Sequence, residues 1–177
     1  LKFVSEPIVD SLTTIGYPKV KMWAKSNPAG VLDGKPTDTD WMIRIGDQFP
    51  DGRIYFVTEA VINARARDYV KTFLDKIETR DDLATPYQNI NSGEVLDYEF
   101  HGIPIGYSWG KGHKVVVLIS SSNFTRYQVN PNLPMNDGEF FRRNPGDGQS
   151  YIFNGVEMSP RVAVQRVHFS PQHPTQI

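Results

Sequence analysis

Apolar and polar residues alternate from Trp41 to Phe49, and this pattern predicts a β-strand with one buried face. The apolar side chains fall on one parity and the polar ones on the other, with Met42 as the exception. A period of two is the repeat of a strand, because successive side chains point to opposite faces of a sheet. Asp47 stands on the apolar parity, which predicts a bulge or a position near the rim of the sheet.

A second strand is expected after a tight turn. The turn residues are Pro50-Asp51-Gly52, and they suit a turn because proline fixes φ, aspartate bonds its own backbone and glycine accepts a positive φ. An apolar run rich in β-forming residues then extends from Ile54 to Val57. The two runs predict a β-hairpin, and its apolar face needs a second layer to cover it.

Other segments of the same character predict the remaining strands, which are 3–12 at a sheet edge, 19–26, 94–100, 114–120, 150–154 and 161–169. Residues 19–26 alternate strictly between apolar and polar, as a half-exposed strand does. Residues 114–120 (KVVVLIS) are apolar almost throughout, which predicts a central strand buried on both faces.

One short helix is expected near residues 68–77. Asp68 suits its amino end, and apolar residues follow at the spacing of one helix face, namely Val70, Phe73, Leu74 and Ile77. Residues 60–67 fit a strand or a helix, and 27–38, 79–93 and 130–148 are expected as loops. The sequence therefore predicts an all-β fold, a jelly-roll β-sandwich of about eight or nine antiparallel strands with one short helix.

Composition narrows the classes of function. The sequence has 177 residues, no cysteine and a net charge of −1. One domain over residues 1–177 can bury roughly 70% of its unfolded surface, and the lack of cysteine excludes disulfides and thiolate sites while leaving the compartment open. The charge pattern and the short apolar runs predict no nucleic-acid partner and no membrane span. The start at Leu1, without an initiator methionine or a signal peptide, predicts a piece of a longer polypeptide.

One pentapeptide, Gly106-Tyr107-Ser108-Trp109-Gly110, matches the G-x-S-x-G pattern of the α/β-hydrolase nucleophile elbow. In those enzymes the serine stands on a sharp turn between a buried strand and a helix. Here Gly102 and Pro104 interrupt the segment before it, and the segment after it leads into the β-rich run at 114–120. The context therefore favours a glycine-rich loop between two strands.

The remaining polar candidates favour structural roles. The histidines lack the spacing of a zinc site and are expected at rims or caps; they are His101, His113, His168 and His173. The aspartates around the hairpin lack the order of a Ca²⁺ loop and are expected as solvated turn carboxylates; they are Asp33, Asp38, Asp40, Asp47 and Asp51. No metal and no cofactor is therefore predicted. Trp41 is expected in the core, whereas Trp23 lies on the exposed parity and is a candidate for stacking on a sugar.

Residues 112–132 (GHKVVVLISSSNFTRYQVNPN) resemble the G-H-R-[IL]-R-[LV]-x-I-S-S-S-N-F-P-R-[FY]-x-x-N-x-N signature of a serine hydrolase family. That family contains cocaine esterase, α-amino acid ester hydrolases, glutaryl acylases and, more distantly, X-Pro dipeptidyl peptidases. Three other stretches agree with it in order, namely Phe3 to Pro7, Asp38 to Arg53 and Gln165 to Thr175. Thr125 departs from the signature, because the family usually has proline there.

The resemblance implies that catalysis belongs to a different domain. In this family an α/β-hydrolase domain carries the catalytic Ser, Asp and His, a helical cap covers the site, and a C-terminal jelly roll of the galactose-binding-like type packs against both. This chain matches the jelly roll alone, which implies no catalytic residue here and a catalytic domain of the same polypeptide as the partner. The residues that the resemblance suggests for the domain interface or a substrate wall are Phe124, Arg126, Tyr127, His168 and His173.

Two other functions stay open at this point. A carbohydrate-binding β-sandwich module would need exposed, coplanar aromatic side chains. A self-sufficient esterase using Ser108 and His113 would need the strand-to-helix elbow that the local sequence does not favour. The sequence also leaves open a homo-oligomer and the substrate of the parent enzyme.

Overall fold

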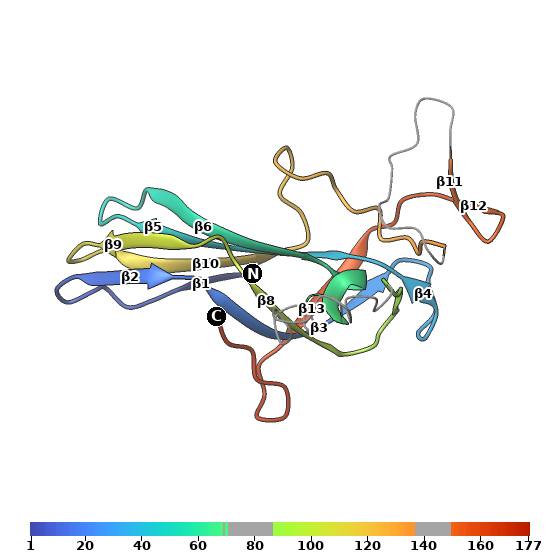
Figure 1. Cartoon of the computed structure of the whole chain (residues 1–177), viewed down its shortest axis with the longest axis horizontal. Coiled ribbons are helices and arrows are strands. Elements are labelled where there is room, and N and C mark those ends of the chain that lie inside the picture. The colour runs from blue at the N-terminus through green and yellow to red at the C-terminus, as the bar shows by residue number, and fades with distance from the viewer. Residues whose placement is uncertain (69, 71–86, 137–149) are drawn as a thin grey trace, which may run out of the picture.

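The computed structural model describes residues 1–68, 70, 87–136 and 150–177, and strands dominate these residues (Figure 1). In chain order the strands are β1 (Lys2–Val4), β2 (Leu12–Gly16), β3 (Lys19–Pro28), β4 (Pro36–Thr37), β5 (Asp40–Gln48), β6 (Ile54–Asn63), β7 (Ile90–Asn91), β8 (Leu96–His101), β9 (Ile105–Trp109), β10 (Lys114–Ser120), β11 (Tyr151–Phe153), β12 (Val156–Met158) and β13 (Ala163–His168). A single 3₁₀ turn, η1 (Ala64–Ala66), follows β6 in this part of the chain.

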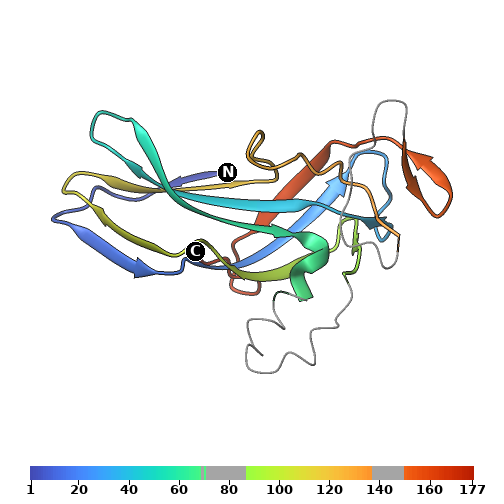
Figure 2. The same ribbon diagram turned by 45° about the horizontal axis from the view of Figure 1, so that its top comes forward.

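The strands pair into antiparallel ladders that form two layers. One layer is the four-stranded sheet β1-β10-β5-β6, and the other contains the three-stranded sheet β13-β3-β8. The β2–β9 ladder extends this second layer, since β2 runs into β3 and β8 runs into β9. Figure 2 shows β2 and β9 below β5, β6 and β10 at one end of the molecule. The prediction of an all-β sandwich of antiparallel strands is confirmed.

The main core lies between the four-stranded and the three-stranded sheets. Its buried members come from facing strands and are Val20, Met22, Ala24, Trp41, Ile43, Ala60, Ile62, Ala64, Ile90, Leu96, Tyr98, Phe100 and Ile119. The strict alternation of β3 follows from this packing, because every second side chain enters the core. The indole of Trp41 meets the ring of Tyr98 edge-on, with 5.9 Å between the centroids.

The hairpin predicted from the runs Trp41–Phe49 and Ile54–Val57 is present. Strands β5 and β6 pair along their whole length, and the register shifts between Ile45 and Gly46. At this bulge a Cβ on Gly46 would stand 3.0 Å from the carbonyl oxygen of Tyr55, which explains why a residue without a side chain occupies the position. The bulge predicted from the parity of Asp47 is therefore present, and it lies one residue before Asp47.

Several sequence-based expectations need correction. Residues 105–109 form strand β9, where a glycine-rich loop was expected. The ambiguous segment 60–67 is strand to Asn63, whose side chain then caps η1 by accepting a hydrogen bond from the backbone N–H of Arg65. Most of the helix expected at 68–77 lies outside the described residues.

Strand β10 is interior to its sheet, between β1 and β5, as predicted. Its side chains are less buried than the sequence suggested, since only Val116 and Ile119 are fully covered among the seven. The described residues also hold more strands than the eight or nine expected. The reason is that β4, β7 and β9 fall within segments expected as loops, and that β12 pairs with β11, the strand predicted at 150–154, after a tight turn.

Gly102 marks the passage from β8 to β9 and approaches the other layer closely. A Cβ at this position would stand 2.7 Å from Cγ of Pro18 and 2.8 Å from the carbonyl oxygen of Glu59. Gly102→Ala should therefore lower the free energy of unfolding by about 1–3 kcal/mol, measured by urea denaturation. Gly106→Ala is the matched control, because nothing lies within 4 Å of its Cβ. Equal losses for the two variants would contradict the close approach.

Candidate functional site

A polar cluster surrounds Asp47 at one end of the sandwich. Its carboxylate is 1% exposed and accepts hydrogen bonds from two other strands. The hydroxyl of Tyr107 on β9 donates to Oδ2 over 2.9 Å, and Nδ1 of His113, just before β10, lies 2.8 and 2.9 Å from the two oxygens. An N–H at Nδ1 of the imidazole can donate to either carboxylate oxygen.

Aromatic rings enclose this cluster. Phe49 packs on the His113 ring, with 4.6 Å between centroids, and Trp109 meets Tyr107 edge-on at 4.8 Å. Burial, together with the hydrogen bond to Asp47, raises the pKa of Tyr107 to about 12, so this phenol keeps its proton at neutral pH. The cluster joins β5, β9 and β10 through one buried carboxylate.

Ser108 does not take part in this cluster. It lies between Tyr107 and Trp109 on β9, so its side chain points to the opposite face of the strand. Its hydroxyl instead shares a 2.7 Å hydrogen bond with that of Thr13 on the neighbouring strand. The other ring nitrogen of His113 lies against Gly110, where a Cβ would stand 3.2 Å from Nε2. The structure therefore brings an acid and a histidine together, and Ser108 does not join them as a nucleophile.

Three of the five predicted site residues belong to one loop. Asn123 and Tyr127 donate hydrogen bonds to the two carboxylate oxygens of Glu59 on β6, over 3.3 and 2.8 Å, and Arg126 forms an ion pair with the same carboxylate. Glu59 is 8% exposed, whereas Phe124 at the loop tip is 74% exposed. The hydrogen bond to Tyr127 and the charge of Glu59 raise the pKa of Arg126 above its ordinary value. The buried carboxylate thus fixes a loop that presents one aromatic ring.

The other two predicted residues, His168 and His173, lie around Trp23 on β3. The His173 ring packs on the indole of Trp23 with 4.8 Å between centroids, and it meets His168 edge-on at 5.6 Å. Thr175 ties the chain end to this place, since its hydroxyl donates to the carbonyl of His168 and accepts from the N–H of Trp23. Trp23 is therefore partly covered rather than a free stacking platform.

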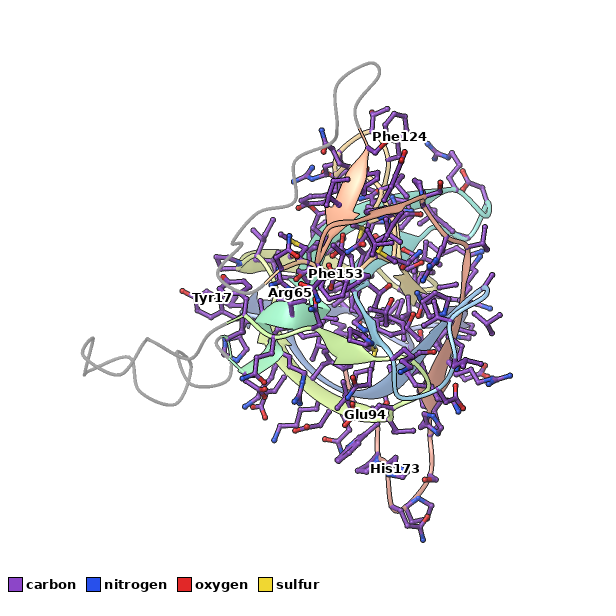
Figure 3. All side chains as sticks on the ribbon, turned by 90° about the vertical axis from the view of Figure 1, so that its right-hand side faces the viewer. Tyr17, Arg65, Glu94, Phe124, Phe153 and His173 are labelled. Atoms are coloured by element: carbon purple, nitrogen blue, oxygen red, sulfur yellow. The ribbon has the colours of Figure 1, made fainter. Side chains whose placement is uncertain are left out.

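The five residues do not form one site. Figure 3 shows Phe124 and His173 at opposite ends of the molecule in that view, and Figure 1 shows the chain segments that carry them on opposite sides of the sandwich. Two separate surfaces result, one around Glu59 and one around Trp23.

A second buried carboxylate was also expected to be solvated. Asp38 is 1% exposed, and the side-chain amides of Asn63 and Asn130 each donate to its Oδ2 and to Oδ1 of Asp40, over 2.8–3.0 Å. Each amide has two N–H groups, so each can serve both carboxylates. Burial raises the pKa of Asp38 to about 6 despite these hydrogen bonds. The expectation of solvated carboxylates is wrong for Asp38 and Asp47 because tertiary contacts bury both.

Within the described ranges, no group of three or more His, Asp or Glu side chains is placed to hold a metal ion. The same ranges contain no helix that is long and apolar enough to cross a membrane.

Comparison with known proteins identifies the family of this chain. All of residues 1–177 match the family described as the X-Pro dipeptidyl-peptidase C-terminal non-catalytic domain. The chain belongs to this family.

Individual relatives agree with this assignment. This non-catalytic domain is 25% identical to the cocaine esterase of Rhodococcus sp. (strain MB1 Bresler) over all 177 residues, which cover 24% of the esterase. A solved α-amino acid ester hydrolase matches 99% of the domain at 25% identity with a TM-score of 0.68, and the domain covers 24% of that chain. An aminopeptidase from a marine sediment archaeon, Thaumarchaeota archaeon, has the same TM-score and coverage at 21% identity, which shows the fold alone. The domain spans about a quarter of the length of the relatives that it matches.

Sequence reasoning missed the partners that organise these clusters in the domain. His113 was expected without a carboxylate, yet Asp47 stands 66 residues before it in the chain. The available signal was the parity of Asp47, since a carboxylate on the apolar side of a strand needs buried partners. Asn63 gave no such signal, because it lies in segment 60–67, which fitted both a strand and a helix. Glu59 lies between that segment and the strand predicted to Val57.

Proposed function

We propose that this chain is the accessory C-terminal domain of a serine hydrolase of the α/β-hydrolase type, an acyl ester or amide hydrolase or an X-Pro dipeptidyl peptidase. In this proposal it packs on the catalytic domain of the same polypeptide and shapes one wall of the active site. The observation that carries the proposal is the match over residues 1–177 to a non-catalytic domain family, together with relatives of which the chain covers only 24%.

The chemistry of the described residues supports an accessory role. Acyl transfer by a serine needs its hydroxyl within hydrogen-bond reach of a base that a third group orients. Asp47 orients His113, but the hydroxyl of Ser108 bonds to Thr13 on the other face of β9. In our proposal the nucleophile, its base and the oxyanion hole belong to the neighbouring domain.

The two surfaces described above are the proposed contacts. The Glu59 carboxylate holds Arg126 and Tyr127 in place, so Phe124 is presented on a loop with a fixed base, which suits a wall of a substrate site. His168 and His173 form the second surface over Trp23. Large apolar or amphipathic side chains held at a surface in this way are common at domain interfaces.

A serine-reactive fluorophosphonate probe tests the proposal on the complete polypeptide that contains this sequence. We expect the labelled serine to map outside residues 1–177, and labelling to be unchanged by Ser108→Ala. Because Ser108 is exposed on the outer face of β9, this variant should fold normally. Covalent labelling of Ser108 itself would overturn the proposal.

The three tryptophans do not support the carbohydrate-binding alternative. It needs exposed aromatic platforms, yet Trp41 and Trp109 are 1% and 3% exposed and Trp23 packs under His173. Calorimetric titration with a panel of glycans separates the two functions.

A further inference from the structure

A cleft of about 770 Å³ lies where the chain segment after β10 meets the segment that leads into β13. Residues from the stretch 121–132 and residues 160–163 line it, together with Tyr151 of β11. Figure 1 shows these segments towards the end of the molecule that carries β11 and β12. Sites for small molecules have volumes of about 300–1,000 Å³, so the cleft has the size of a ligand site.

Reciprocal hydrogen bonds hold the two sides of this cleft together. The backbone N–H of Arg161 donates to the carbonyl of Pro131 over 2.9 Å, and the side-chain amide of Asn132 donates to the carbonyl of Arg161 over 2.8 Å. The loop side is fixed in turn, because the amide of Asn130 donates to the buried carboxylate of Asp38. The cleft therefore belongs to the folded framework, as ligand sites that are formed before the ligand binds do.

Arg161 is the one charged residue among the described residues that line the cleft. The hydrogen bond from the N–H of Ala29 to the carbonyl of Val162 continues the β13 ladder to this point, so side chains still alternate between the two faces. Arg161 shares its parity with Gln165, whose amide reaches Thr39 in the other layer. The alternation therefore directs the guanidinium towards the loop that follows β10.

This guanidinium stands among apolar side chains. The ion pairs of the described residues leave it without a carboxylate. The same lining contains three apolar side chains that are more than half exposed, namely Phe124, Val129 and Val162. A planar guanidinium matches a carboxylate through two parallel hydrogen bonds, and one cation balances one negative charge. A phosphate carries more charge and would need further cationic donors.

We propose that this cleft binds an organic carboxylate, with its carboxylate group on Arg161 and its apolar part against Phe124, Val129 and Val162. Hydrolysis of an ester, amide or peptide bond by water releases such an acid. The ligand class is therefore also the product class of the proposed function. Only this link rests on the proposed function, whereas the site itself rests on the unpaired guanidinium and its apolar surroundings.

Isothermal titration calorimetry with hydrocinnamate tests the site on the complete polypeptide that contains this sequence. We expect saturable binding that is at least about tenfold weaker for hydrocinnamyl alcohol, which lacks the charge, and for acetate, which lacks the apolar part. Arg161→Gln should weaken the binding of hydrocinnamate at least about tenfold as well, because glutamine cannot form the charged pair. Arg166→Gln is the matched control, since Arg166 lies on the same strand opposite Lys25 and outside the cleft lining.

Several results would overturn this proposal. They are no binding of hydrocinnamate, equal affinity for the acid and its alcohol, equal affinity for the acid and acetate, and binding that Arg161→Gln leaves as strong as Arg166→Gln does. The last result would place the acid elsewhere in the polypeptide. The comparison of the three probes needs no variant, so it decides even where Arg161→Gln lowers stability. The proposed function fails by a different result, which is fluorophosphonate labelling of Ser108.

Discussion

Asp38→Asn should flatten the dependence of stability on pH between about pH 4 and pH 6. In the folded chain, burial holds the pKa of Asp38 at about 6, above its ordinary value of 3.8. The folded state therefore binds the proton more tightly than the unfolded state. Stability from this group is complete below about pH 4, and it declines as the pH rises through 6.

The size of this effect follows from the displacement of the pKa. One pKa unit corresponds to about 1.4 kcal/mol, so ionisation of Asp38 costs the folded state about 3 kcal/mol at neutral pH. An asparagine keeps an oxygen that accepts from Asn63 and Asn130, but it cannot ionise. The unfolding free energy of Asp38→Asn, relative to wild type, should therefore rise by about that amount from pH 4 to pH 7.

Urea denaturation across this pH range measures the difference, and Asp51→Asn is the control. Hydrogen bonds from Arg53 lower the pKa of exposed Asp51, so its contribution has the opposite sign and is lost as the pH falls. A wild-type profile that runs parallel to that of Asp38→Asn would show that burial does not hold the proton on Asp38.

Asp47→Ala should lower the free energy of unfolding by about 2–5 kcal/mol, because two donors lose their acceptor at a cost of about 1–3 kcal/mol each. The alanine would leave the Tyr107 hydroxyl and the His113 Nδ1–H without their acceptor, and it would open space beneath the Phe49 and Trp109 rings. Asp47→Asn should cost less, because its amide oxygen still accepts one of the two hydrogen bonds. Denaturant unfolding monitored by tryptophan fluorescence gives both values.

Ser108→Ala provides the matched control on the same strand. Its hydroxyl bonds to Thr13 in an exposed place, so the loss should stay within about 0.5 kcal/mol. If Asp47→Ala were no more destabilising than Ser108→Ala, the carboxylate would not hold β5, β9 and β10 together.

Much of the fold could be predicted because half-buried strands alternate apolar and polar residues along the sequence. The alternation at Lys19–Ser26 and Trp41–Phe49 reflects side chains that enter one core, and the turn at Pro50-Asp51-Gly52 fixes how the second run folds back. Strand β9 was missed because glycines flank it and interrupt its apolar pattern. Its ladder comes from pairing with β2, 89 to 97 positions away in the chain, which the local sequence does not signal.

The polar clusters were harder to predict, since their partners are distant in the chain. Asp38 meets Asn130 across 92 positions and Glu59 meets Tyr127 across 68, and neither pair forms a local motif. The five proposed interface residues came from the family resemblance, which selects conspicuous segments without placing them in space. The structure separates them into two surfaces, around Glu59 and around Trp23.

Turnover of an activated ester measures most directly whether this β-sandwich depends on a neighbour for its chemistry. We predict that residues 1–177 alone do not accelerate hydrolysis above the rate in buffer, whereas the complete polypeptide does. Turnover by the 177-residue chain that disappears in Ser108→Ala would contradict the account.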